Sequence, residues 1–169
     1  MKLTSAGVVN GVLQDKYGNQ SKDADAFVYG IPQYSFPLEW DDVPEGTKSF
    51  ALECMDYDNT EDEGMIWIHW LVSEISKDAR SLAENAAADP ALVQGMTSWN
   101  LPYGPYEEIP AEVCAHYGGP SPDTTHQYEV TLYALSEPLQ LSQGFFYKEM
   151  RRKMKDKILD QATLTFNYG

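Results

Sequence analysis

The sequence predicts a mainly β protein, an antiparallel Greek-key β-sandwich-like domain with a few flanking helices. Several short runs have the composition of strands, and the segments between them are rich in turn-forming residues. A helical pattern appears only late in the chain, and short strands with one late helix favour a sandwich. Because 169 residues is the size of one ordinary domain, we expect a single domain over residues 1–169.

Four segments carry the strand prediction. Residues 50–57 (FALECMDY) and 127–135 (QYEVTLYAL) alternate larger apolar residues with smaller or polar ones. Residues 66–75 (IWIHWLVSEI) form a β-branched and aromatic run, which is typical of a strand buried on both faces. Residues 162–169 (ATLTFNYG) are predicted to be the final strand.

Residues 148–157 (KEMRRKMKDK) predict an amphipathic helix. They contain half of the chain's 12 basic residues, and Phe146, Met150, Met154 and Ile158 recur at every fourth position. The favoured interpretation is a helix packed on the domain with a solvated basic face. Binding to a membrane surface or to a partner is the alternative.

Composition excludes some classes of function. The formal net charge of −14 argues against a nucleic-acid partner. We expect no transmembrane segment, because no apolar run approaches the ~20 residues of a membrane helix. The N-terminus lacks the apolar region of a signal peptide, so a cytoplasmic location is expected. Cys54 and Cys114 are too few for a disulfide framework and are expected to be buried free thiols.

Histidine, tyrosine and aspartate residues gather near the predicted strand ends. His126 and Tyr128 are two positions apart, so they project from the same face of their strand. His69 lies within an apolar strand, where its imidazole needs a partner; a satisfied core histidine is the simpler alternative. Asp56 and Asp58 end the preceding strand, and a hairpin-like return would bring them close to His69. A carboxylate beside an imidazole raises the pKa of the histidine and fixes its tautomer.

The loop HYGGPSPDTTHQY (residues 116–128) supplies the remaining candidates. Gly118 and Gly119 allow a tight turn and are expected to expose backbone N–H groups to a ligand, while prolines such as Pro120 restrict the loop. These residue types predict a site for a small anionic ligand or phosphorylated group, without a cofactor. The predicted ligand-binding residues are Asp56, Asp58, His69, Gly118, Gly119, Pro120, His126 and Tyr128.

An enzyme and a metal site are the alternative interpretations. A hydrolase would use His and Asp as base and orienting residue, but no Gly-x-Ser-x-Gly or Cys–His signature supplies a nucleophile, so no catalytic residue is assigned. A metal site formed by His69, His126 and a carboxylate lacks the usual ligand spacing, so no metal ligand is assigned either.

Three blocks in fixed order, QYSFPLEWDDVPEGTKSFALECMDYDNT, WIHWLVSEIS and YGGPSPDTTHQYEVTLYAL, resemble the phosphatidylethanolamine-binding protein family, closest to its bacterial and archaeal Raf-kinase-inhibitor-like branch. The resemblance spans nearly the whole chain. It implies an antiparallel β domain with flanking helices, and a small pocket for anions such as phosphate or a phospholipid headgroup. It also implies a regulatory or kinase-inhibitor-like role with a protein partner, and it is compatible with a homodimer.

The same resemblance suggests roles for individual residues. Asp56 and Asp58 look like the two aspartates of the family's Asp-Pro-Asp-x-Pro motif. His69 looks like the histidine of its Trp-x-His block. His126 and Tyr128 look like the histidine and tyrosine of His-Arg-Tyr.

The chain departs from the family pattern around these motifs. Tyr57 and Thr60 stand where prolines are usual, so we expect a less rigid loop after Asp56. Gln127 replaces the usual arginine, which removes a cation from the rim of the pocket.

A longer link is the other departure. Residues 101–116 exceed the family's short glycine-rich connection, and Tyr103 and Tyr106 within them could form a lid over the ligand. An ordinary surface insertion is the favoured interpretation, because loops tolerate changes in length. The chain ends in a strand-like tail, so we expect it to lack the C-terminal helix that helps close the pocket in eukaryotic members.

Overall fold

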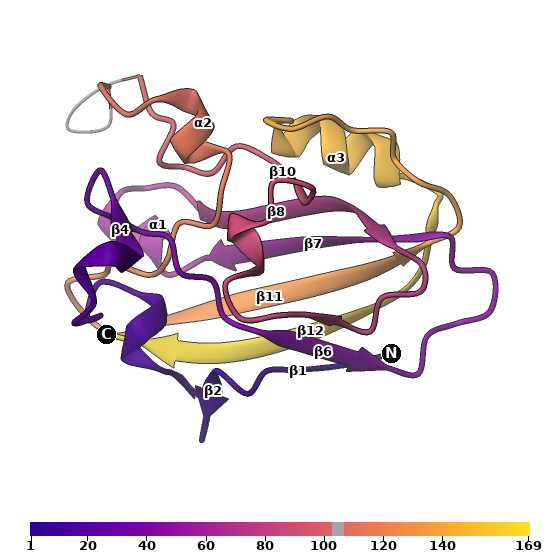
Figure 1. Cartoon of the computed structure of the whole chain (residues 1–169), viewed down its shortest axis with the longest axis horizontal. Helices are drawn as coiled ribbons and strands as arrows, with labels where there is room; N and C mark the ends of the chain where they lie inside the picture. The colour runs from indigo at the N-terminus through magenta and orange to yellow at the C-terminus, as the bar shows by residue number, and fades with distance from the viewer. Residues whose placement is uncertain (103–106) are drawn as a thin grey trace.

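The structure, a computed structural model, describes residues 1–102 and 107–169 and is mainly β, as predicted. Within these residues the largest sheet has the strand order β10-β8-β7-β11-β12-β3-β2. Figure 1 shows its long strands side by side: β7 (Ser49–Asp56), β8 (Trp67–Ser76), β11 (His126–Leu135) and β12 (Ile158–Tyr168). The short strands of this sheet are β2 (Val8–Val9), β3 (Val12–Leu13) and β10 (Val93–Gln94).

A smaller sheet packs against one face of the large one and completes the predicted sandwich. It consists of β1 (Lys2–Thr4), β6 (Leu38–Asp41) and β9 (Ser81–Leu82), in the order β1-β6-β9. The indole of Trp40 on β6 meets the ring of Phe50 on β7, with 5.5 Å between their centroids. Both side chains belong to the main apolar core. A separate antiparallel pair is formed by β4 (Phe27–Val28) and β5 (Ile31–Pro32).

The opposite face of the large sheet is covered by α3 (Tyr147–Met154). Met150 and Met154 of this helix are buried in a second apolar cluster with residues of β7, β8 and β11. The prediction of a packed amphipathic helix is therefore confirmed. The apolar stripe is shorter than expected, because Phe146 precedes the helix, Ile158 begins β12, and both are exposed.

Core layers on both faces explain the burial of the central strands. Every residue of β7 is buried, although its sequence alternates larger with smaller or polar residues. Burial on both faces is also observed for most of β8, as its sequence predicts. The other helical elements are short: α1 (Asn59–Asp62), α2 (Ala111–Cys114), and the 3-10 turns η1 (Asp15–Tyr17), η2 (Ala24–Ala26) and η3 (Ala86–Ala88).

One edge of the large sheet differs from the antiparallel prediction. β12 and β3 pair in parallel, with Asn167 opposite Val12, so the sheet is mixed. The long strands are antiparallel to their long neighbours. After the β7–β8 pair, the chain returns to place β11 on the other side of β7.

This arrangement brings three strand ends together. In the register of the large sheet, Asp56 at the end of β7 lies opposite Tyr128 of β11 and Trp67 of β8. Figure 1 places α1, which follows β7, at this same end of the molecule. Residues that are far apart in the sequence therefore meet at one end of the sandwich, where these strands begin or end.

The two cysteines, Cys54 and Cys114, are both buried free thiols, as expected. Tyr103 and Tyr106, the residues of the suggested lid, lie outside the described residues. Among residues 1–102 and 107–169, no helix has the length and apolar character needed to cross a membrane.

Candidate functional site

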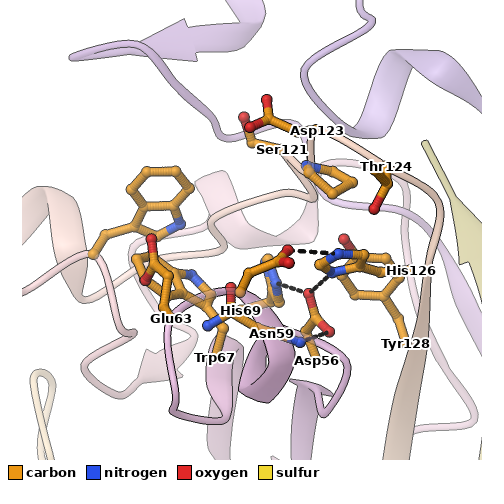
Figure 2. A pocket seen from close by; sticks show the side chains of 13 residues that line it. Asp56, Asn59, Glu63, Trp67, His69, Ser121, Asp123, Thr124, His126 and Tyr128 are labelled. Atoms are coloured by element: carbon orange, nitrogen blue, oxygen red, sulfur yellow. Dashed lines mark hydrogen bonds and ion pairs between the residues drawn. The ribbon is translucent and has the colours of Figure 1, made fainter.

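A cavity of about 480 Å³ opens where β7, β8 and β11 meet (Figure 2). Asp56 comes from the end of β7, His69 from β8, and His126 and Tyr128 from β11. Because side chains two positions apart share a strand face, His126 and Tyr128 both point into this cavity, as predicted. The structure thus brings together four of the residues singled out by the sequence.

The remaining walls come from loops and from α1. Asn59 and Asp62 belong to α1, and Glu63 follows it. The loop before β11 provides one side of the rim, and Trp99 another. The rim residues of that loop are Ser121, Pro122, Asp123 and Thr124. The lining therefore contains four carboxylates, those of Asp56, Asp62, Glu63 and Asp123, beside two imidazoles.

Asp56 organises the base of the cavity. Its side chain is buried, and its Oδ2 lies 2.8 Å from Nδ1 of His126, which donates a hydrogen bond to it. Its Oδ1 accepts a hydrogen bond of 3.1 Å from the backbone N–H of Asn59. The same carboxylate therefore fixes the orientation of His126 and anchors the start of α1.

His126 lies between two carboxylates. Its Nε2 is 3.0 Å from Oδ2 of Asp62, on the side opposite Asp56. Burial alone would lower the pKa of His126, but the hydrogen bond to Asp56 and the charges of Asp56, Asp62 and Asp58 raise it above its usual value. A raised pKa favours the imidazolium form, in which both ring nitrogens donate.

The pKa of His69 is shifted in the direction opposite to that of His126. Its Nδ1 donates a hydrogen bond of 2.7 Å to the carbonyl oxygen of Gly118, and a carbonyl can only accept. Burial lowers the pKa of His69 to about 4, although the Gly118 carbonyl and the charge of Asp56 act in the other direction. At neutral pH the ring is neutral and its Nε2 carries a lone pair. This Nε2 is buried, has no hydrogen-bond partner in the part of the chain that the structure describes, and lies 4.0 Å from Oδ2 of Asp56.

Tyr128 packs between the two imidazoles. Its ring stacks on His126, with 6.4 Å between centroids, and meets His69 edge-on at 5.1 Å. Burial and the nearby charge of Asp56 raise the pKa of Tyr128, so its hydroxyl keeps its proton. The phenol therefore offers a neutral polar group to the cavity.

Asp58 does not face the cavity. It is exposed, and its Oδ2 accepts a hydrogen bond of 2.8 Å from the backbone N–H of Gln127. It therefore ties the turn after β7 to the start of β11. Strand alternation would place Asp58 on the face of Asp56, but β7 ends at Asp56 and the alternation ends with it.

The glycine pair is buried beside the cavity and does not line it, and neither does Pro120. The N–H of Gly118 donates to the carbonyl oxygen of His69 at 2.9 Å, and the N–H of Gly119 donates to that of Pro32 at 2.7 Å. The expectation that these amides would face a ligand is therefore wrong. The glycines are required instead by close packing, because a Cβ on Gly118 would collide with the indole of Trp99.

Sequence reasoning missed most of the loop and α1 lining. Asn59, Asp62 and Glu63 lie in the acidic stretch NTEDEG, which begins directly after Asp58, the second aspartate of the motif. Their closeness to Asp56 and Asp58 in the sequence was the signal that could have identified them as lining residues. Among the described residues, no cluster of His, Cys, Asp or Glu has the arrangement of a metal site.

Comparisons with known proteins agree with the fold. A family model described as phosphatidylethanolamine-binding protein matches residues 4–169. The chain is 36% identical over 160 residues to the YxkA protein of Bacillus subtilis, covering 92% of each chain. It is also 32% identical to a UPF0098 protein of Aquifex aeolicus, covering 95% of this chain and 90% of the other.

Two crystal structures have the same architecture. One is described as a phosphatidylethanolamine-binding protein homolog from Chlamydia trachomatis; it is 28% identical, has a TM-score of 0.77, and the match covers 99% of this chain and 96% of the other. The second, YbcL of Escherichia coli, is 22% identical with a TM-score of 0.75, covers the same shares of the two chains, and supports the fold alone.

Proposed function

Because this chain belongs to the phosphatidylethanolamine-binding protein family, we propose that its cavity binds a small phosphate-like oxyanion, either free or carried by a lipid headgroup. Membership of the family indicates ligand binding in general. The choice of an oxyanion rests on His126. Its Nε2 lies on the side of the ring away from Asp56 and already contacts a carboxylate oxygen of Asp62. A phosphate oxygen has the same hydrogen-bonding character as that carboxylate oxygen.

Asp62 would leave this position when a ligand binds. Its side chain is 54% exposed, and it ends a four-residue helix in which no residue is buried. An ion pair that is open to solvent on one side contributes little, typically less than about 1 kcal/mol. A ligand that makes further hydrogen bonds inside the cavity can therefore replace Asp62 on His126.

The acidic lining does not exclude a small anion. Exposed charges are screened over about 8–10 Å, whereas a hydrogen bond to a charged group contributes ~1.5–3 kcal/mol at contact. His126 and Tyr128 provide such contacts from the base of the cavity. When the free energy lost in translational and rotational freedom on association is subtracted, a few contacts of this kind support dissociation constants in the micromolar to millimolar range.

A hydrolase is the less supported alternative. The 2.8 Å contact between Asp56 and His126 has the form of an orienting carboxylate and a general base. However, none of the hydrogen bonds among the described residues joins a Ser, Thr or Cys to Nε2 of His126, and burial raises the pKa of the Cys54 thiol. A binding module is therefore favoured. A regulatory or kinase-inhibitor-like role, a protein partner and a homodimer stay predictions of the family resemblance.

A crystal soaked with inorganic phosphate tests the proposal directly. We expect density for the anion within hydrogen-bond distance of His126 Nε2, with the Asp62 side chain turned away. A second crystal soaked with phosphoethanolamine separates the free anion from a headgroup: an ordered amine beside Glu63 or Asp123 would support the headgroup. Phosphate density elsewhere, with Asp62 still on His126, would contradict the proposal.

A further inference from the structure

Nε2 of His69 is a buried polar atom that has no hydrogen-bond partner among the described residues. Buried polar groups normally have a hydrogen-bond partner, and each exception needs a reason. His69 is 3% exposed and lines the cavity, and its other ring nitrogen is committed to the Gly118 carbonyl. The unpaired atom is therefore an acceptor that requires a donor from the occupant of the cavity.

Asp56, which faces this nitrogen, does not supply that donor. Oδ2 of Asp56, 4.0 Å away, is itself an acceptor and already receives the proton of His126 Nδ1. Figure 2 shows His69, Asp56 and His126 converging on one region of the cavity. In this region two acceptors, Nε2 of His69 and Oδ2 of Asp56, lie 4.0 Å apart, and His126 is the donor beside them.

We propose that the oxyanion brings its own proton: the site takes a phosphate or phosphate ester that carries a P–OH group and discriminates against a dianion that has none, such as sulfate or a fully deprotonated phosphate monoester. One oxygen accepts from Nε2 of His126, and the P–OH group donates to Nε2 of His69. This inference rests on the proposed function, and it specifies which ionisation state of the ligand binds.

A doubly charged ligand would meet an unfavourable set of groups. A monoester dianion, like sulfate, has no P–OH group, so a bare oxygen would face the lone pair of His69 and the carboxylate of Asp56. The other charged and titratable groups around the cavity are Asp62, Glu63, Asp123, His126 and Tyr128, of which only His126, with its raised pKa, can carry positive charge. A second negative charge on the ligand would thus add repulsion at this place and remove the proton that His69 needs.

Protonation of His69 itself is the competing explanation. At neutral pH, only a small fraction of molecules would carry this proton in the free protein, because burial lowers the pKa of His69 to about 4. A phosphate group already carries a proton in a large fraction of molecules near neutral pH. The ligand is therefore the readier source of the missing donor.

Calorimetric titration of the full chain with methyl phosphate, a phosphate monoester, and with sulfate, at about pH 6 and about pH 8, distinguishes these cases. Sulfate has no proton throughout this range, whereas the monoester loses its only P–OH proton; inorganic phosphate would keep one P–OH group even as the dianion. The charge of His126 affects both anions, so the ratio of the two affinities reports the proton of the ligand. We expect methyl phosphate to bind at least about tenfold more tightly than sulfate at pH 6, and this preference to fall about tenfold by pH 8.

The variant His69→Asn provides the matched test. An asparagine amide can still donate to the Gly118 carbonyl, but it has no group in the place of Nε2. We expect this variant to lose the preference for methyl phosphate at pH 6, whereas His116→Asn, which alters a histidine outside the cavity, keeps it.

The outcomes separate this inference from the proposed function. Sulfate that binds as tightly as methyl phosphate at pH 6, a ratio of the two affinities that does not change with pH, or a full preference retained in His69→Asn would each overturn the inference. Sulfate binding too weak to detect while methyl phosphate binds would support it, provided that methyl phosphate binding weakens by pH 8. Binding of neither anion at any pH would instead reject the proposed oxyanion site.

Discussion

Asp56 and His126 are joined by a buried hydrogen bond of 2.8 Å that links the end of β7 to the start of β11. The two residues are 70 positions apart in the sequence, and they meet because β7 and β11 are antiparallel neighbours. This bond sets both the orientation and the charge of the imidazole. The properties of the cavity depend on it.

Removing the charge of Asp56 should lower the pKa of His126. In Asp56→Asn, the amide no longer attracts the imidazolium, so we expect the pKa of His126 to fall. An NMR titration of the His126 ring protons measures this. A pKa that stays at the wild-type value would show that Asp56 does not control the charge of His126.

His69 should make the protein less stable in acid. Its folded pKa, about 4, is below the ordinary value of 6.5, so the unfolded chain binds more protons between these values. The free energy of unfolding should therefore rise with pH through this window, by roughly 2–3 kcal/mol for this group, and the contribution is lost as pH falls toward 4.

Denaturant unfolding at about pH 4.5 and about pH 7 checks this by comparing the protein with His69→Asn. The variant should show a smaller loss of stability on acidification, because it lacks the group that gains a proton on unfolding. Equal losses in the two proteins would contradict the assignment of His69 as a buried neutral ring.

Asp62 should compete with the ligand. In Asp62→Asn, the carboxylate that contacts His126 Nε2 is removed, so we expect phosphate to bind about 3- to 10-fold more tightly. Asp58→Asn is the matched control, because it changes the net charge equally but alters a side chain that does not line the cavity. Equal gains in both variants would mean that net charge alone decides affinity.

Gly118 should be required for stability through packing. In Gly118→Ala, the new methyl group would collide with the Trp99 indole, and we expect a loss of about 1–3 kcal/mol in a denaturant titration. Ser121→Ala, at the exposed rim of the same loop, should change stability by less than about 0.5 kcal/mol. An unaffected Gly118→Ala would show that the loop has room for a side chain.

The sequence predicted those site residues whose position depends on regular strand geometry. His126 and Tyr128 share a face because they lie within β11. The same alternation failed for Asp58, since the chain leaves the sheet after Asp56. Strand periodicity carries information only as far as the strand extends.

The rest of the site depends on contacts between distant segments. The N–H of Gly119 donates a hydrogen bond to the carbonyl oxygen of Pro32, which lies 87 positions earlier in the chain. No local sequence pattern predicts that hydrogen bond. Asp62 reaches His126 from a short helix without an apolar stripe. The parallel pairing of β3 with β12 is equally invisible in the sequence, because β3 has only two residues.

The most direct measurement is the affinity of inorganic phosphate for His126→Asn at about pH 6. This substitution can keep a donor for Asp56 but removes the Nε2 that is assigned to the ligand. We predict that the variant stays folded, as judged by circular dichroism, and loses phosphate binding by at least about tenfold, whereas His116→Asn binds like the unaltered protein. A folded His126→Asn that binds phosphate with unchanged affinity would contradict the account.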